Sequence, residues 1–196
     1  PDRNGAVRLP VAGRRARIER IQLTKLRRLV QVAVRQSAFY AAKLAPLELD
    51  ARAKDLDGFK GRFPFTTKEE LVRDQLAHPP YGSNLTCSRE AYTRCHQTSG
   101  STGAPLRWLD TPDSWRHLLD NWRRIFGAAG VTAQDRFLFA FSFGPFIGFW
   151  SALESALQRG CFCFPAGSMT SAARIQAILD HRITVLACTP TYALHL

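Results

Sequence analysis

The chain has 196 residues, of which 45% are hydrophobic and 22% are charged, and this composition is ordinary for a soluble globular protein. The length allows one domain with a sizeable core, or a large piece of a bigger one. No run of about 18 apolar residues occurs, so the sequence predicts no transmembrane helix. The polar, basic N-terminus lacks the apolar segment of a secretory signal. Because the first residue is Pro1 and the only methionine is Met169, we expect a cropped or processed N-terminus.

The net charge of +11 is concentrated near the N-terminus. Residues 1–35 contain ten Arg and Lys against two acidic residues, which gives +8 and leaves +3 for the other 161 residues. Apolar side chains recur here at helical spacing and predict an amphipathic helix over 14–36. Such a basic helix either binds a membrane or nucleic acid, or packs against its own domain. No aromatic residues interleave with the arginines and no nucleic-acid motif follows, so we favour packing and expect neither a nucleic-acid nor a membrane partner.

The next predicted elements are short. Residues 44–62 mix charges with proline and glycine and predict a loop or a short helix, and 63–65 are expected to be extended. A helix begins after Thr67, because this residue and Glu70 have the spacing of a capping box. The helix ends at 78–82, where two prolines and a glycine occur.

The most distinctive stretch is rich in hydroxyl groups and glycine. It reads Thr98-Ser99-Gly100-Ser101-Thr102-Gly103-Ala104-Pro105. Such a run favours neither helix nor strand, and its closely spaced N–H and O–H donors suit an anion with many oxygens, above all a nucleotide phosphate. A flexible linker or surface turn is the alternative interpretation. The run matches neither a Walker A loop nor the dinucleotide fingerprint. Short predicted strands at 92–96 and 107–109 would make it the tip of a hairpin.

Beyond the hairpin the pattern alternates between helices and apolar strands. The expected order is helix 111–126, strand 136–142, helix 147–158, strand 161–164, helix 170–181 and strand 184–188. The expected fold class is α/β, a parallel or mixed sheet with helices on both faces, preceded by a helical N-terminal segment. We place the domain boundary between 1–62 and 63–196. Ligands of such sheets bind beyond the carboxyl ends of strands, where 141–145 and 189–192 lie.

The five cysteines are odd in number and include no Cys-x-x-Cys pair. Together with the lack of a secretory signal, they favour reduced thiols and a cytoplasmic location. Cys161 and Cys163 would point to the same face of a strand, most simply as small core residues, and we predict no metal ligands among the residues of this chain.

Several segments, in order, resemble the adenylate-forming enzymes, a superfamily of acyl- and aryl-CoA ligases, luciferases and peptide-synthetase adenylation domains. The hydroxyl-rich run is similar to their phosphate-binding signature. Within the superfamily, the chain looks most like the phenylacetate–coenzyme A ligases. The segments that carry this likeness are Ser37-Ala38-Phe39-Tyr40, Phe63-Pro64-Phe65-Thr66-Thr67-Lys68-Glu69-Glu70-Leu71, Arg94-Cys95-His96-Gln97 and Thr189-Pro190-Thr191-Tyr192-Ala193-Leu194. The resemblance covers most of the chain from about residue 17 onward.

The resemblance implies a two-step reaction. A carboxylate attacks the α-phosphate of Mg-ATP to give an acyl-adenylate and pyrophosphate, and the thiol of coenzyme A then displaces AMP to give a thioester. The residues that would bind the phosphates of ATP are Thr98, Ser99, Gly100, Ser101, Thr102 and Gly103, of which Thr102 would also face the Mg²⁺ or the α-phosphate.

The resemblance also implies an acyl pocket. Phe141, Phe143 and Gly144 would line it, which suggests an aromatic acid as the substrate. His96 would orient the loop or the substrate carboxylate. Phe141 and Phe143 fit equally well as core residues of a strand, and His96 fits as a structural residue. No catalytic residue is predicted.

The chain departs from the family in two ways. Ala104 stands where family members usually carry a basic residue. Leu106 stands where the general superfamily signature has a lysine, which phenylacetate ligases also lack, with Arg107 as the nearest substitute. The chain also stops before the family's adenine-binding segment and C-terminal lysine domain. We therefore expect a portion of a longer ligase that, by itself, binds ATP weakly and does not turn over. The alternative function is a non-catalytic adenylate-fold protein that binds a ligand or partner. A homodimer through an uncovered sheet edge is a further expectation.

Overall fold

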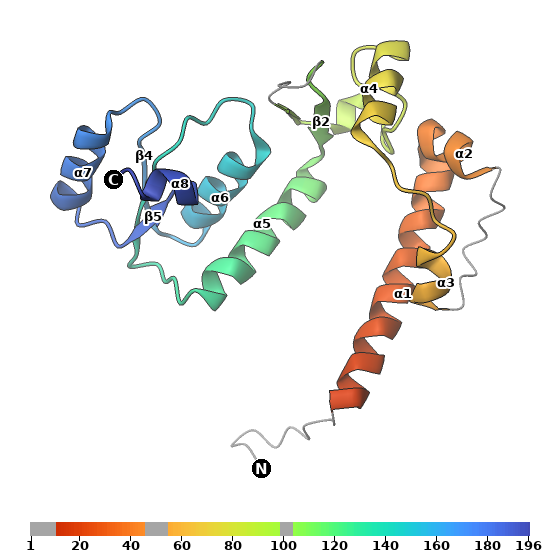
Figure 1. Cartoon of the computed structure of the whole chain (residues 1–196), viewed down its shortest axis with the longest axis horizontal. Helices are drawn as coiled ribbons and strands as arrows, with labels where there is room; N and C mark the ends of the chain where they lie inside the picture. Colours follow the sequence, from red (N-terminus) through yellow and green to blue (C-terminus); the bar gives the residue numbers. More distant parts are fainter. Residues whose placement is uncertain (1–10, 46–54, 99–103) are drawn as a thin grey trace. The chain divides into compact units, whose positions relative to one another are not determined.

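The computed structural model of the chain describes residues 11–45, 55–98 and 104–196. The chain divides into two compact units, Pro1–Ser88 and Arg89–Leu196, here called the N-terminal and the C-terminal unit (Figure 1). None of the helices in the described ranges is long and apolar enough to cross a membrane.

The N-terminal unit is helical, as predicted. Its helices are α1 (Val11–Gln36), α2 (Ala38–Leu44), α3 (Leu56–Lys60) and α4 (Lys68–Ala77). The predicted amphipathic helix is confirmed as α1, which packs with α2 and α3. The capping box at the start of α4 is also confirmed, because Thr67 and Glu70 exchange both of its hydrogen bonds.

The boundary between the two units differs from the one predicted after residue 62. Lys43 of α2 forms an ion pair with Glu70 of α4 at 2.6 Å, and Phe39 donates its backbone N–H to the carbonyl oxygen of Ser83. These contacts join the segment after residue 62 to the helices before it, so the N-terminal unit extends to Ser88.

The C-terminal unit begins with a short 3-10 helix (Arg89–Ala91) and the predicted hairpin. Strands β1 (Arg94–Gln97) and β2 (Arg107–Asp110) pair antiparallel, with His96 opposite Trp108. The hairpin forms a sheet of its own and is not an edge of the larger sheet.

The second sheet is parallel, and its strand order is β4-β3-β5. Its elements, with the helices around it, are α5 (Pro112–Ala128), β3 (Arg136–Phe139), α6 (Ile147–Gln158), β4 (Phe162–Pro165), α7 (Ser171–Asp180), β5 (Val185–Ala187) and α8 (Pro190–Ala193). The predicted alternation is thus confirmed, although β3 ends three residues before the predicted end of its strand. The chain leaves the sheet there and turns at Gly144, whose φ of +45° lies in the region that favours glycine.

The core lies on both faces of the parallel sheet. Phe137 and Phe139 of β3 are buried against residues of α5 and α6, whereas Leu138 between them is buried on the other face with Ala177 of α7. Figure 1 shows α6 and α7 on opposite sides of the strands. Alternate side chains of a central strand point to opposite faces, so β3 can anchor both helical layers. The predicted α/β class, with helices on both faces and a helical segment before it, is confirmed.

The two strand-associated cysteines lie where the sequence predicted. Cys161 is buried in the core cluster of α5 and α6, and Cys163 packs against the same cluster. Burial raises the pKa of the Cys163 thiol to about 11. A thiol with a raised pKa stays protonated at neutral pH, which suits a small core residue.

Candidate functional site

The hydroxyl-rich loop is closed at its base by two hydrogen bonds. The backbone N–H of Thr98 donates to the carbonyl oxygen of Leu106, and the N–H of Leu106 donates to Oγ1 of Thr98, both at 3.0 Å. The predicted phosphate-binding residues Ser99, Gly100, Ser101, Thr102 and Gly103 lie outside the described residues. Leu106 is buried, which explains why an apolar side chain stands at the position where the general signature has a lysine.

The base of this loop is joined to the turn that follows β3. The backbone N–H of Gln97, at the end of β1, donates to the carbonyl oxygen of Pro145 at 3.0 Å. Pro145 directly follows Gly144, where a Cβ atom would come within 3.1 Å of the Phe146 ring. The structure therefore brings together two of the predicted site segments, the loop base and the aromatic turn.

Phe141 and Phe143 lie beyond the end of β3 and are half-buried. They pack against the core cluster, but Phe141 also stacks on Phe149 with 4.0 Å between ring centroids, and Phe143 lies 4.9 Å from the ring of Trp150. The alternating phenylalanines thus divide into two buried core residues within the strand and two partly accessible ones after it. The second pair forms an aromatic wall at the carboxyl end of β3.

His96 faces Asp110 in the interior of the hairpin region. The two residues are 7% and 5% exposed, and Nδ1 of His96 lies 3.8 Å from Oδ2 of Asp110. The His96 ring stacks on Trp115 with 5.1 Å between centroids and 13° between planes. Burial lowers the pKa of His96, although the carboxylate of Asp110 acts in the opposite direction. Burial of His96 therefore favours its neutral form.

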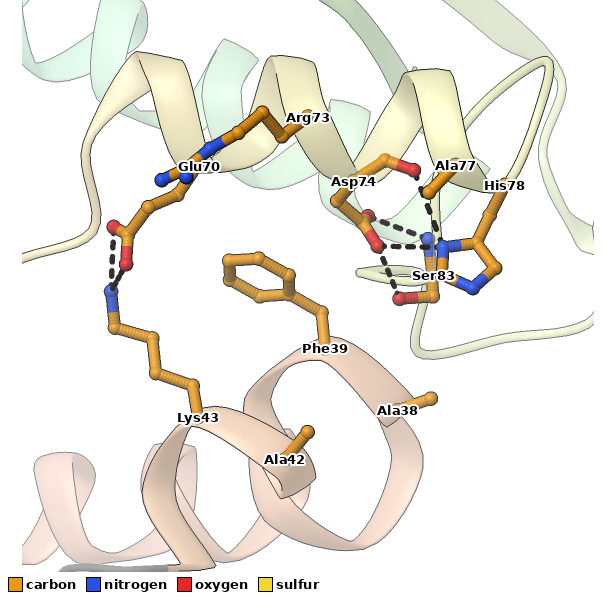
Figure 2. A pocket seen from close by; sticks show the side chains of 10 residues that line it. All are labelled: Ala38, Phe39, Ala42, Lys43, Glu70, Arg73, Asp74, Ala77, His78 and Ser83. Atoms are coloured by element: carbon orange, nitrogen blue, oxygen red, sulfur yellow. Dashed lines mark hydrogen bonds and ion pairs between the residues drawn. The ribbon is translucent and has the colours of Figure 1, made fainter.

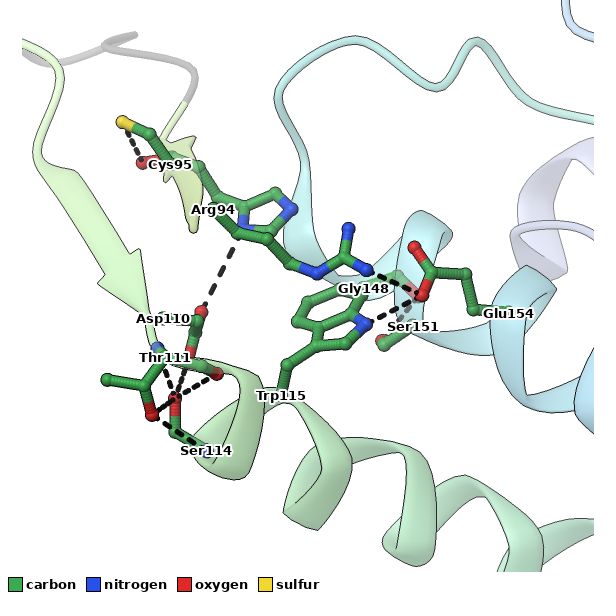
Figure 3. A network of polar contacts seen from close by, with 10 residues as sticks. Arg94, Cys95, Asp110, Thr111, Ser114, Trp115, Gly148, Ser151 and Glu154 are labelled. Carbon is green, nitrogen blue, oxygen red and sulfur yellow. Dashed lines mark hydrogen bonds and ion pairs between the residues drawn. The ribbon is translucent and has the colours of Figure 1, made fainter. Parts of the chain in front are cut away.

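Glu154 of α6 bonds to two residues of this cluster and so connects it to the helices around the parallel sheet (Figure 3). Its Oε2 accepts hydrogen bonds from the indole Nε1 of Trp115 at 2.7 Å and from Nη2 of Arg94 at 3.0 Å. The Arg94 guanidinium also lies 4.5 Å from the centre of the Trp115 ring. One carboxylate thus holds both β1 and the first turn of α5.

Sequence analysis missed Asp110, Trp115 and Glu154 as neighbours of His96. The register offers a signal for the first of them, because His96 pairs with Trp108 and Asp110 lies two residues further on the same face of the hairpin. Glu154 is separated from Trp115 by 39 residues, and no local pattern indicates that contact.

The loops after the three parallel strands meet at one edge of the sheet. Arg174 donates to the carbonyl oxygens of Ala166 and Gly167 at 2.9 Å each, and Oγ of Ser142 donates to the carbonyl oxygen of Gly167 at 3.2 Å. The ring of Tyr192, in α8, lies 4.8 Å from the Arg174 guanidinium. The segments predicted to lie beyond strand ends therefore share one edge, which is where ligands of such sheets bind.

The N-terminal unit contains a pocket of its own. It lies between α2 and α4, with Phe39, Lys43, Glu70, Asp74 and His78 among its lining (Figure 2). Both Glu70 oxygens accept from Nζ of Lys43, at 2.6 and 2.7 Å, and Asp74 accepts from Ser83 and His78. These carboxylates are engaged within the unit, and the described residues that line the pocket include none of the predicted site residues.

Comparison with known proteins identifies the class to which this arrangement corresponds. No protein-family model matches the sequence. The phenylacetate-coenzyme A ligase of Thermus thermophilus is 30% identical over 184 residues, which are 91% of this chain and 39% of that protein. The enzyme of the same name from Aromatoleum evansii is 30% identical over 199 residues, with 96% and 43% covered. The chain thus spans about two fifths of the length of these relatives.

Solved structures agree with the sequence relatives. The structure of a 2-hydroxyisobutyryl-CoA ligase in complex with 2-HIB-AMP and CoA has a TM-score of 0.85 and 28% identity, and the match covers 95% of this chain and 39% of that one. An open conformation of that ligase has a TM-score of 0.81 and 26% identity. The chain is thus similar in fold and in sequence to adenylate-forming CoA ligases. Within that superfamily, the chain is phenylacetate–coenzyme A ligase-like.

Proposed function

We propose that this chain supplies the phosphate-binding loop and one wall of the acyl pocket to an enzyme that activates a carboxylic acid with ATP. The observation that carries the proposal is the hydrogen bond from Gln97 to Pro145. It holds the base of the hydroxyl-rich loop beside the aromatic turn, so a nucleotide phosphate at the loop and an acyl group at the turn would lie next to each other. That proximity is what the attack of a carboxylate on a phosphate requires.

In this reaction a carboxylate oxygen bonds to the α-phosphorus of ATP as the bond to pyrophosphate breaks. The thiol of coenzyme A then replaces AMP at the acyl carbon. Nucleotidyl transfer depends on positioning and on neutralisation of charge, which a loop of N–H and O–H donors provides without covalent chemistry. Mg²⁺ would accompany ATP and neutralise phosphate charge. Thr102 is the residue of this chain that we assign to face this ion.

For the acyl group we propose an aromatic acid. Phe141 and Phe143 are half-buried rings beyond a strand end, next to the turn at Gly144. Flat rings at such a position suit a flat ligand. The similarity to phenylacetate-coenzyme A ligases supports the same choice. Coenzyme A is the proposed acceptor, since the relatives are CoA ligases.

A direct test measures binding and turnover of the 196-residue chain separately. We expect weak binding of ATP and tighter binding of a phenylacetyl-adenylate analogue by calorimetry, with both reduced at least tenfold in a Ser101→Ala/Thr102→Ala variant. A Thr24→Ala variant, which removes an exposed hydroxyl of α1, is the control. Because the chain spans two fifths of its relatives' length, we expect no ATP–pyrophosphate exchange with phenylacetate. Absence of binding to both ligands would contradict the proposal.

The alternative is an adenylate-fold protein that binds without catalysis. Ala104 favours it, because the loop lacks a positive charge at the position after its last glycine. Adenylate binding combined with no exchange in a protein that carries every segment of the relatives would support this alternative. Exchange in that protein would exclude it.

A further inference from the structure

His96 and Asp110 hold the two buried side-chain polar atoms that have no hydrogen-bond partner in the described part of the chain. The atoms are Nδ1 of His96 and Oδ2 of Asp110, and they face each other at 3.8 Å. This distance is too long for a hydrogen bond. It is short enough for a strong electrostatic influence of the carboxylate on the ring, because both groups are withdrawn from water. Buried polar atoms without partners are rare and point to a function for the pair.

Neighbouring side chains fix both members of this pair. Trp115 stacks on the His96 ring and sets its plane. Oδ1 of Asp110 accepts a hydrogen bond from Oγ of Ser114 at 2.8 Å, which orients the carboxylate and leaves Oδ2 facing His96. The other charged groups that act on His96 are Arg94 and Glu154, and these two are paired with each other at 3.0 Å. Of these charged groups, Asp110 has the largest electrostatic influence on the His96 ring.

The position of the proton on the His96 ring decides which hydrogen bonds its two nitrogen atoms can make. A neutral ring carries one N–H, and a carboxylate opposite Nδ1 favours the tautomer with the proton on Nδ1. Nε2 then has a lone pair and accepts hydrogen bonds. An anionic oxygen cannot donate to it, so Nε2 can hold a phosphate or carboxylate oxygen only after a second proton is added. His96 stands directly before Gln97, which contacts the aromatic turn, and two residues before Thr98 at the loop base.

We propose that Asp110 is a positioning residue that keeps the His96 proton on Nδ1, so that the chain takes up one proton at His96 when an anionic ligand binds beside the loop. The part of this inference that concerns the ligand rests on the proposed function. The part that concerns the tautomer does not, because it describes the ligand-free chain.

Nitrogen-15 spectra of histidine-labelled protein at neutral pH test the tautomer directly. We expect His96, assigned with a His96→Gln variant, to show a protonated Nδ1 and an unprotonated Nε2. Asp110→Asn should increase the share of the Nε2–H tautomer, because an amide N–H can donate to Nδ1. Asp113→Asn, an exposed carboxylate three residues away, should leave the spectrum unchanged. A wild-type His96 with its proton on Nε2 would overturn the inference, and this spectrum is decisive even if the Asp110 variant does not fold.

Proton uptake is measured by calorimetry with the phenylacetyl-adenylate analogue in two buffers of different ionisation enthalpy. We expect uptake of about one proton at pH 7.5 in the wild type and none in His96→Gln, which has no titratable group at this position. Binding without proton uptake in the wild type would overturn the inference. Absence of any binding counts against the proposed function, and the tautomer spectrum then decides the role of Asp110 alone.

Discussion

The backbone N–H of Gln97 donates to the carbonyl oxygen of Pro145 at 3.0 Å, and this bond connects the hairpin to the turn after β3. On one side of it are Thr98 and the hydroxyl-rich loop, and on the other are Gly144 and the half-buried Phe143. His96 precedes Gln97 and is held by Trp115, whose indole is in turn bonded to Glu154. The described part of the candidate site is therefore held together by backbone hydrogen bonds and part-buried side-chain contacts.

The Thr98 hydroxyl should contribute to closure of the loop. Thr98→Val removes the acceptor for the N–H of Leu106, and we expect a loss of about 1 kcal/mol in the free energy of unfolding. Thr98→Ser retains the oxygen and should lose less than half as much. Urea denaturation of the three proteins measures the difference. Equal stability of the Val and Ser variants would show that the hydroxyl does not close the loop.

Glu154 should be the most important polar residue for the position of the hairpin. Glu154→Leu leaves both the Trp115 indole and Arg94 without their acceptor, and we expect a destabilisation of about 1–3 kcal/mol. Glu154→Gln keeps an oxygen acceptor without the charge and should lie between this variant and the wild type. Gln158→Leu, an exposed position on the same helix, serves as the control in urea denaturation. A Glu154→Leu protein as stable as this control would contradict the described network.

His96 should make the stability of the chain decrease in mild acid. Its pKa in the folded chain lies below the usual value of 6.5, so the unfolded chain binds a proton at a pH where the folded one does not. The stability associated with neutral His96 is thus complete above pH 6.5 and is lost as the pH falls toward the lower folded-state pKa.

The contribution of His96 to the pH dependence of stability can be isolated with a variant whose residue 96 does not titrate. The free energy of unfolding should decrease more between pH 7.5 and pH 5.5 for the wild type than for His96→Gln, because all other ionisable groups are common to both. Denaturation at the two pH values gives this comparison. Equal decreases would show that the His96 pKa is the same in the folded and unfolded chain.

Phe143 should contribute to binding of the acyl group. Phe143→Ala removes one ring of the aromatic wall, and we expect an aromatic adenylate analogue to bind about tenfold more weakly. Phe162→Ala is a suitable control, because Phe162 is a partly exposed ring at the other end of a neighbouring parallel strand. Calorimetric titration of both variants measures the effect. If the two variants bind equally, the ligand does not contact the wall at Phe143.

Most of the elements of the fold could be predicted from the sequence because they depend on local patterns. The capping box of Thr67 and Glu70 and the apolar run that forms β3 are encoded within a few residues. The contacts that build the site are not local. Pro145 is bonded to Gln97 from 48 positions away, and Glu154 reaches Arg94 across 60. Such contacts follow from how sheets and helices pack, so local sequence patterns do not reveal the partners of the predicted site residues.

The central claim is that a nucleotide at the hydroxyl-rich loop lies beside the aromatic turn. Its most direct test uses the paramagnetic Mn²⁺–ATP complex with phenylalanine-labelled chain, because the metal broadens the resonances of nearby rings. The account predicts the strongest broadening at Phe141 and Phe143, with less at Phe162 at the opposite end of the parallel sheet, and loss of the effect in Ser101→Ala/Thr102→Ala and with Mn²⁺ alone. Broadening elsewhere in the chain without broadening at Phe141 and Phe143 would contradict it.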